Sequence, residues 1–126
     1  MIDHVSVAVR DLKRAVMFYQ AVLATLGYEK LEVRPATIAF GKKYSEFWIY
    51  HRPQMTAVPD DSGTHVALRA ISLEMVDAFH AVALVNGGMS DGAPGLRPQH
   101  GDGYYAAFIR DLDGNRIEAV TFVQKP

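Results

Sequence analysis

The chain has 126 residues, 49% of them hydrophobic, which is enough apolar material for one globular domain with a core. Its 13 basic and 14 acidic residues nearly balance, so no basic stripe is available for nucleic acid, and the absence of cysteine excludes disulfides and thiolate chemistry. No apolar run is long enough to span a membrane, and the N-terminus does not resemble a leader peptide. We therefore expect a cytoplasmic protein that binds neither nucleic acid nor membranes.

The first half of the chain is predicted to form a strand, a helix and then two or three shorter strands. Residues 2–9 alternate between apolar and other side chains, as strands do. Asp11 can cap a helix that begins at Leu12, carries an apolar stripe at helical spacing and ends at Gly27. The shorter strands are expected at 28–33, 37–40 and 45–50, and the proline-containing stretch 52–63 is predicted to be a linker.

The second half repeats this pattern. A shift that places His4 on His65 also places Gly27 on Gly88, and Ser72 then stands as a cap before a second apolar-striped helix. We therefore expect an α+β fold in which two βαβββ units form a curved, mixed-sheet cup with the helices on its outer face. The expected organisation is a single domain over 1–126, with unit one at 1–51, the linker at 52–63 and unit two at 64–123.

The middle of the second unit departs from the repeat. Residues 89–103 are rich in glycine and proline, which predicts a long loop in place of a strand. Loops of this length are uncommon inside compact domains and often serve as lids over sites. His100 in this loop is a candidate acid or base that would close over a bound substrate.

A hairpin near the end of the chain carries the most informative carboxylate. Asp113-Gly114 predicts a tight turn between two strands, and Glu118 interrupts the apolar second strand. A carboxylate that points into an enclosed space must be paired, protonated or bound to a cation. His4 and His65 occupy equivalent places in the repeat and indicate a metal cation. Because a single histidine or glutamate is more often scaffold or surface, this prediction depends on the three residues together.

These features resemble the vicinal oxygen chelate superfamily, which contains glyoxalase I, bleomycin-resistance proteins, extradiol dioxygenases and fosfomycin-resistance enzymes. The resemblance covers nearly the whole chain, and its most specific part is the hairpin from Asp111 to Glu118. It implies that His4, His65 and Glu118 hold a divalent metal ion (Zn, Mn, Fe(II), Co or Ni) with positions left open for a substrate. It also implies a homodimer, in which units are sometimes exchanged so that ligands come from both chains.

Departures from the family's patterns leave the activity open. The strand that supplies the fourth ligand of glyoxalase I has Trp48 at that place, and an indole N–H cannot bind a metal. Extradiol dioxygenases carry an acid tyrosine ten residues before the glutamate, where this chain has Phe108. Ser6, two residues after His4, matches a hydroxyl of the fosfomycin-resistance enzymes.

Other side chains of the same strand parity predict a pocket beside the metal ligands. Tyr104, further along its strand than the family's acid tyrosine, and His100 are the candidate catalytic residues. Aromatic side chains are also common in ordinary sheet packing, so an aromatic lining alone does not establish a ligand site. Arg69 is a candidate partner for an anion. The predicted pocket residues are Ser6, Trp48, Tyr50, Arg69, Tyr104 and Phe108.

Two functions remain open. The first is a metal-dependent, lyase- or dioxygenase-like enzyme of the glyoxalase/dioxygenase type, whose small-molecule substrate chelates the metal through adjacent oxygens. The second is a metal-free protein of the bleomycin-resistance type that binds a drug or metabolite in the cup. The triad of His4, His65 and Glu118 favours the enzyme, whereas the missing fourth ligand and the missing tyrosine acid favour the binding protein.

Overall fold

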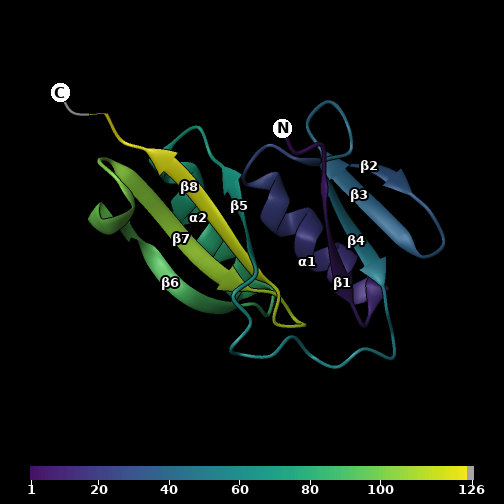
Figure 1. The fold of residues 1–126 in the computed structure, drawn as a ribbon. Coiled ribbons are helices and arrows are strands. Elements are labelled where there is room, and N and C mark those ends of the chain that lie inside the picture. Colours follow the sequence, from purple (N-terminus) through teal and green to yellow (C-terminus); the bar gives the residue numbers. More distant parts are fainter. Residues whose placement is uncertain (125–126) are drawn as a thin grey trace.

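The computed structural model describes residues 1–124, which form two βαβββ units (Figure 1). The first contains β1 (Val5–Val9), α1 (Leu12–Ala24), β2 (Glu29–Val33), β3 (Thr37–Gly41) and β4 (Phe47–His51). The second contains β5 (His65–Arg69), α2 (Leu73–Val85), β6 (Met89–Leu96), the 3-10 helix η1 (Pro98–His100), β7 (Tyr104–Arg110) and β8 (Arg116–Phe122). The predicted α+β class and the duplicated unit are confirmed. None of the helices within 1–124 is long and apolar enough to cross a membrane.

Both helices begin at the predicted caps. The Asp11 side chain accepts a hydrogen bond from the Arg14 N–H, and the Ser72 hydroxyl accepts one from the Met75 N–H. These bonds satisfy amide groups that have no partner within the helix, which is why short polar residues are favoured there. The matched caps give two helices of 13 residues each, in equivalent places of the two units.

Each unit forms a four-stranded sheet, in the orders β1-β4-β3-β2 and β5-β8-β7-β6. The first and last strands of each unit pair in parallel, with Val5 opposite Phe47 and Val66 opposite Ile117. Because side chains alternate along a strand, one face of each sheet packs on a helix and the other face stays open. Val9, Ile49 and Ile117 lie on the helix-facing side and are fully or almost fully buried.

The two units share one core. Helices α1 and α2 pack against each other, and Phe18 and Tyr19 of α1 belong to the same buried cluster as Phe79 of α2. In the part of the chain that the structure describes, no hydrogen-bonded strand pair joins the two sheets, so β1 and β5 each remain an edge strand. Figure 1 shows these two strands as the inner edges of their sheets, facing one another across the middle of the molecule.

The turn between β7 and β8 forms hydrogen bonds that join the second unit to the first. The Tyr19 hydroxyl donates to Asp111 Oδ2 at 2.5 Å, and Asn115 Nδ2 donates to the Ala8 carbonyl at 2.9 Å. Arg10 Nε donates to Asp113 Oδ1 at 2.7 Å. Burial raises the pKa of Asp111, while its hydrogen bonds from Tyr19, Asn115 and the Asp113 amide oppose the rise. The acidic turn is therefore also a contact between the units.

The prediction of a long loop at 89–103 is wrong. Residues 89–96 form β6, which pairs antiparallel with β7 but breaks register between Ser90 and Gly92 and again between Gly92 and Gly95. These irregularities remove the alternation by which a strand is recognised in sequence. Because β6 is an edge strand, Pro94 is tolerated within it.

Candidate functional site

A buried carboxylate stands in the open face of the second sheet. Glu118 of β8 is only 2% exposed, and its Oε1 lies 3.0 Å from His65 Nε2 of β5. The Tyr104 hydroxyl of β7 donates to Oε2 of the same carboxylate. Strands β5 and β7 pair with β8 on its two sides, and their registers place Ala67 and Phe108 opposite Glu118. His65 and Tyr104 share a strand face with these two residues and therefore point to the same side of the sheet as the carboxylate. We call His65, Tyr104 and Glu118 the Glu118 cluster.

Tyr104 is held in its protonated form. Burial, the hydrogen bond to Glu118 and the negative charge of Glu118 raise the pKa of Tyr104 to about 12, while the positive charge of Arg69 opposes this rise. At neutral pH the phenol therefore stays protonated and donates a hydrogen bond to Oε2 of Glu118. The other carboxylate oxygen, Oε1, lies on the side of His65.

Aromatic and cationic side chains surround the Glu118 cluster. The His100 ring of η1 lies 5.3 Å from the Tyr104 ring, and the Phe108 ring lies 6.4 Å from the His65 ring. The Arg69 guanidinium lies over Phe122, 4.7 Å from the ring centre. The structure thus brings His65, Arg69, His100, Tyr104, Phe108 and Glu118 together on one sheet.

Sequence reasoning missed one cation of this face, Arg97. Its guanidinium lies 5.4 Å from the centre of the Phe108 ring, and its Nη2 donates to the Ala93 carbonyl at 2.6 Å. A Cβ added at Gly92 or Gly95 would come within 3.2 or 3.1 Å of its terminal nitrogens. In the sequence, the closely spaced glycines before Arg97 indicate this arrangement, but such glycines predict a loop as readily as they predict space for a side chain.

The other predicted residues lie on the first sheet. Ser6 and Trp48 are register partners, and the Trp48 and Tyr50 rings are 6.4 Å apart. Arg34 lies over Trp48 at 4.8 Å and Arg52 lies over Tyr50 at 5.3 Å, so this face is aromatic and cationic. The register gives Trp48 the place in the first unit that Glu118 has in the second.

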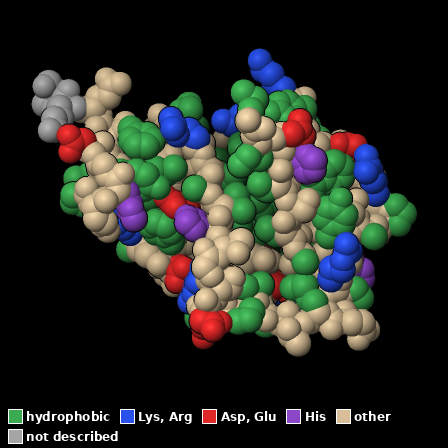
Figure 2. Space-filling model, in the orientation of Figure 1, with side chains coloured by type: hydrophobic (Ala, Val, Ile, Leu, Met, Phe, Trp, Pro, Cys, Tyr) green, Lys and Arg blue, Asp and Glu red, His purple; other side chains and the backbone are tan. Residues whose placement is uncertain are grey.

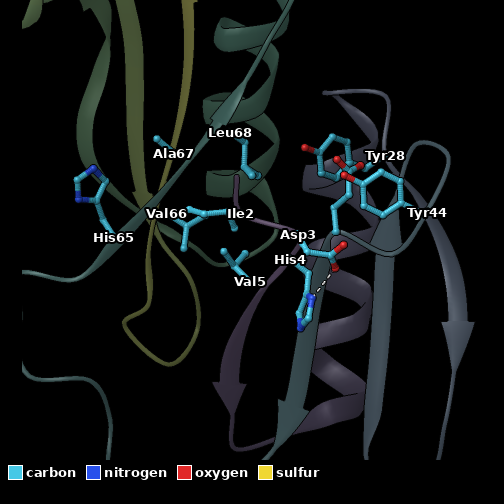
Figure 3. A pocket seen from close by; sticks show the side chains of 11 residues that line it. Ile2, Asp3, His4, Val5, Tyr28, Tyr44, His65, Val66, Ala67 and Leu68 are labelled. Carbon is cyan, nitrogen blue, oxygen red and sulfur yellow. Dashed lines mark hydrogen bonds and ion pairs between the residues drawn. The ribbon is translucent and has the colours of Figure 1, made fainter.

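His4 lies apart from the Glu118 cluster. It precedes β1, is exposed, and its Nδ1 lies 2.7 Å from Asp3 Oδ1. A cleft of about 330 Å³ separates β1 from β5, and Figure 3 shows His4 and His65 on its opposite walls with their rings pointing away from each other. Figure 2 shows hydrophobic side chains along the hollow between the two units. Within residues 1–124 no three acidic or histidine side chains come together as a metal site.

The two donors that do meet are suited to a divalent metal. His65 Nε2 and Glu118 Oε1 are 3.0 Å apart, and imidazole with carboxylate is a common donor pair for Zn, Mn and Fe.

The duplicated βαβββ unit, with His65 and Glu118 on the open face of the second sheet, is the arrangement that the sequence resemblance implies. The family model described as the glyoxalase/bleomycin resistance protein/dioxygenase superfamily matches residues 1–119. The chain therefore belongs to this superfamily. Among curated proteins, no match to the chain was found.

Solved structures agree with this assignment. A glyoxalase/bleomycin resistance protein from Albidiferax ferrireducens is 33% identical with a TM-score of 0.81, over 94% of this chain and 95% of that one. The fosfomycin resistance protein FosX from Listeria monocytogenes is 17% identical with a TM-score of 0.71, over 98% and 93% of the two chains. A glyoxalase/bleomycin resistance protein/dioxygenase family enzyme from Burkholderia phytofirmans is 18% identical with a TM-score of 0.73, over 97% and 98%. The two more distant structures share the fold.

Proposed function

We propose that this protein is a metal-dependent enzyme of the glyoxalase/dioxygenase type that acts on a small molecule with two adjacent oxygens. The observation that carries the proposal is the Glu118 cluster. A carboxylate that is 2% exposed has to be compensated by hydrogen bonds, a proton or a cation, and its two oxygens face His65 and Tyr104. His65 Nε2 lies 3.0 Å from the carboxylate, and an imidazole beside a carboxylate is a donor pair of the kind that binds divalent metal ions.

The third ligand in this proposal is His4 of a second copy. Within one chain His4 and His65 lie on opposite walls of a cleft, so the triad is incomplete without a partner. Both β1 and β5 are edge strands with unpaired backbone groups, and exposed edges of this kind are suited to pairing between chains. A homodimer that joins β1 of one copy to β5 of the other would bring His4 toward the other chain's Glu118 cluster.

The neighbours of the three ligands prepare them for a metal. The bond between Asp3 and the His4 Nδ1–H would leave Nε2 unprotonated and able to act as ligand. Tyr104 fixes the orientation of Glu118 by donating to Oε2. A bound divalent ion would act as a Lewis acid toward chelating oxygens of the substrate. Phe108 and Tyr104 then provide the surface on which the rest of the substrate lies, and His100 stands beside Tyr104 as the candidate proton carrier.

A second function is favoured by one observation. The described part of a single chain holds no three-ligand site, and His65 already pairs with the buried carboxylate. A metal-free protein of the bleomycin-resistance type, which sequesters a small molecule between aromatic sheet faces, is consistent with that arrangement. The Trp48 and Tyr50 face, with an arginine over each ring, would then contribute to the ligand site.

Metal content decides between the two functions. We would measure it by elemental analysis of protein purified without chelator, together with His4→Ala, His65→Ala and Glu118→Ala variants. The enzyme proposal expects near-stoichiometric metal in the wild type and its loss in all three variants, while His51→Ala, at the end of β4, keeps it. A wild type that takes up no Zn, Mn, Fe(II), Co or Ni would refute it.

Mixing of variants tests the source of the third ligand. His4→Ala and Glu118→Ala chains, unfolded together and refolded, would form mixed dimers in which one site has all three ligands. Partial recovery of metal is expected in this mixture. No recovery is expected for a chain that carries both changes, which serves as the control. Equal failure of both samples would show that His4 and Glu118 do not act across chains.

A further inference from the structure

In the part of the chain that the structure describes, two arginines on the open face of the second sheet have no acidic partner. Within residues 1–124, four other arginines pair with carboxylates, as Arg10 does with Asp113 and Arg110 with Asp60, whereas Arg14 and Arg52 have no such pair. Among the described residues no carboxylate lies within ion-pair distance of Arg69 or Arg97. Both guanidinium groups lie instead over aromatic rings of this face, at 4.7 Å from Phe122 and 5.4 Å from Phe108.

The Arg97 side chain is held in one orientation by its neighbours. Its Nη2 donates to the Ala93 carbonyl, and glycines at 92 and 95 leave room that a Cβ would take from the guanidinium. Fixing a long side chain costs conformational entropy. An arginine that is already oriented in the free protein therefore loses less conformational entropy when it binds a ligand. Stacking on a ring contributes only about 0.5–1 kcal/mol at an exposed site, which makes it a weak reason for the whole arrangement.

Both cations stand close to the Glu118 cluster. The positive charge of Arg69 acts on the Tyr104 hydroxyl, and Phe108, which lies under Arg97, is also next to His65. Any molecule that reaches His65 and Glu118 over Phe108 therefore comes within range of a guanidinium. The planar fork of N–H donors in arginine matches the paired oxygens of a carboxylate or phosphate.

We propose that Arg69 and Arg97, at the two edges of this sheet, each offer a site for an oxyanion of the ligand, so that the substrate is an organic acid or phosphate whose apolar body lies on Phe122 or Phe108. This inference rests on the proposed function only in the placing of the ligand beside His65 and Glu118. The anion site itself is made of protein groups and does not need the metal.

The test uses metal-free wild-type protein and three small probes of similar shape. Phenyl phosphate and benzoate carry the two oxyanions, and benzamide is the neutral control. Binding would be followed by NMR through the arginine Nε–H signals. We expect both anions to bind at least about tenfold more tightly than benzamide, a difference of about 1.4 kcal/mol. The ratio of phenyl phosphate to benzoate then identifies which oxyanion the site prefers.

Variants assign the effect to the two arginines. Arg69→Gln and Arg97→Gln should each weaken anion binding at least about fivefold and leave benzamide unchanged, since they remove a charge-assisted pair but no apolar surface. Arg14→Gln, an exposed arginine on α1, should have no effect. Equal binding of anions and benzamide, absence of binding by every probe, or an Arg14→Gln effect as large as the other two would overturn the inference.

The outcomes separate this inference from the proposed enzyme. Protein that takes up metal but shows no preference for the anions keeps the enzyme proposal and loses the anion site. Protein that takes up no metal but binds anions through Arg69 and Arg97 loses the enzyme proposal and keeps the anion site, as a binding protein for organic acids.

Discussion

The open faces of the two sheets have the same register and different chemistry. On the first face Trp48 pairs in register with Ser6, and on the second Glu118 pairs with Ala67. Both side chains are almost completely shielded, with Trp48 9% exposed and Glu118 2% exposed. The duplicated backbone therefore offers two equivalent positions, and one of them holds an indole where the other holds a carboxylate.

The comparison shows how a duplicated fold can carry a buried charge on one open face and an aromatic side chain at the same place on the other. An indole in a shielded position is stable without a partner for a charge, whereas a carboxylate requires the His65 and Tyr104 contacts that are seen around it. Arginines lie over aromatic rings on both faces, so cation–aromatic contacts are common to the two. What distinguishes the second face is a single buried charge with its two neighbours.

The largest effect should come from removing that charge. Glu118→Gln takes away one anionic ligand and is expected to weaken divalent metal binding by more than about 100-fold, beyond the loss typical of residues that only orient a ligand. Trp48→Phe, at the equivalent position of the first face, should leave metal affinity within about twofold. Zinc titration by calorimetry would measure both. Similar losses in the two variants would mean that the faces are not chemically distinct.

The turn that joins the last two strands should contribute more to the free energy of unfolding in the second unit than in the first. In the second unit the Asp111 carboxylate accepts bonds from Tyr19 and from two amides of its own turn, whereas in the first unit the turn bond from the Lys42 N–H to Glu46 stays local. Asp111→Ala leaves these donors without partners and should lower the free energy of unfolding by about 3 kcal/mol. Urea denaturation would measure the change. Asp61→Ala, exposed in the linker, should change it by less than about 0.5 kcal/mol.

Two neighbouring tyrosines on β7 allow a substitution on the open face to be compared with the same substitution on the helix-facing side. The Tyr104 hydroxyl donates to Glu118, whereas the Tyr105 hydroxyl donates to Asp77 of α2 at 2.6 Å. Tyr104→Phe should weaken metal binding about tenfold, because the carboxylate loses the bond that orients it. Tyr105→Phe, equally conservative, should leave metal affinity unchanged. The same calorimetric titration distinguishes them, and equal affinities would remove Tyr104 from the site.

Hydrophobic periodicity was enough to predict the fold, the repeat and the shared face of His65 and Glu118, because strand parity fixes which side chains can meet. It was not enough to place His4, since periodicity within each unit carries no information on how two units turn relative to one another. Tyr104 was expected further from Glu118 than it lies, because a phenol reaches diagonally beyond its own pair in the sheet. Arg97 was missed because β6 was not predicted as a strand. The register breaks of β6 remove the alternation of side chains by which a strand is predicted.

Titration of Asp111 should make the contact between the units depend on pH. Burial is the largest influence on this carboxyl and raises its pKa in the folded state, so folding favours the protonated form. The stabilisation from that form is present below the pKa of the unfolded chain and is lost as pH rises through the folded pKa. The unfolding free energy of the wild type relative to Asp111→Asn should therefore fall as pH rises above about 4, the usual pKa of an aspartate, by no more than about 1.4 kcal/mol per pH unit. Urea denaturation across this range measures it, and a rise with pH would contradict the prediction.

The smallest effect should come from the glycines that make room for Arg97. A Cβ at Gly95 would meet Arg97 Nη1 at 3.1 Å, whereas nothing lies within 4 Å of a Cβ at Gly63 in the linker. A guanidinium can move aside, so Gly95→Ala should change the unfolding free energy by less than about 0.5 kcal/mol. It should nevertheless displace the guanidinium from Phe108 and reduce the preference for phenyl phosphate over benzamide about twofold to threefold, as a fraction of a charge-assisted bond is lost. Gly63→Ala should leave both quantities unchanged. A Gly95→Ala protein with full anion preference would show that the cradle does not position Arg97, and the preference of the second face would then depend on Arg69 alone.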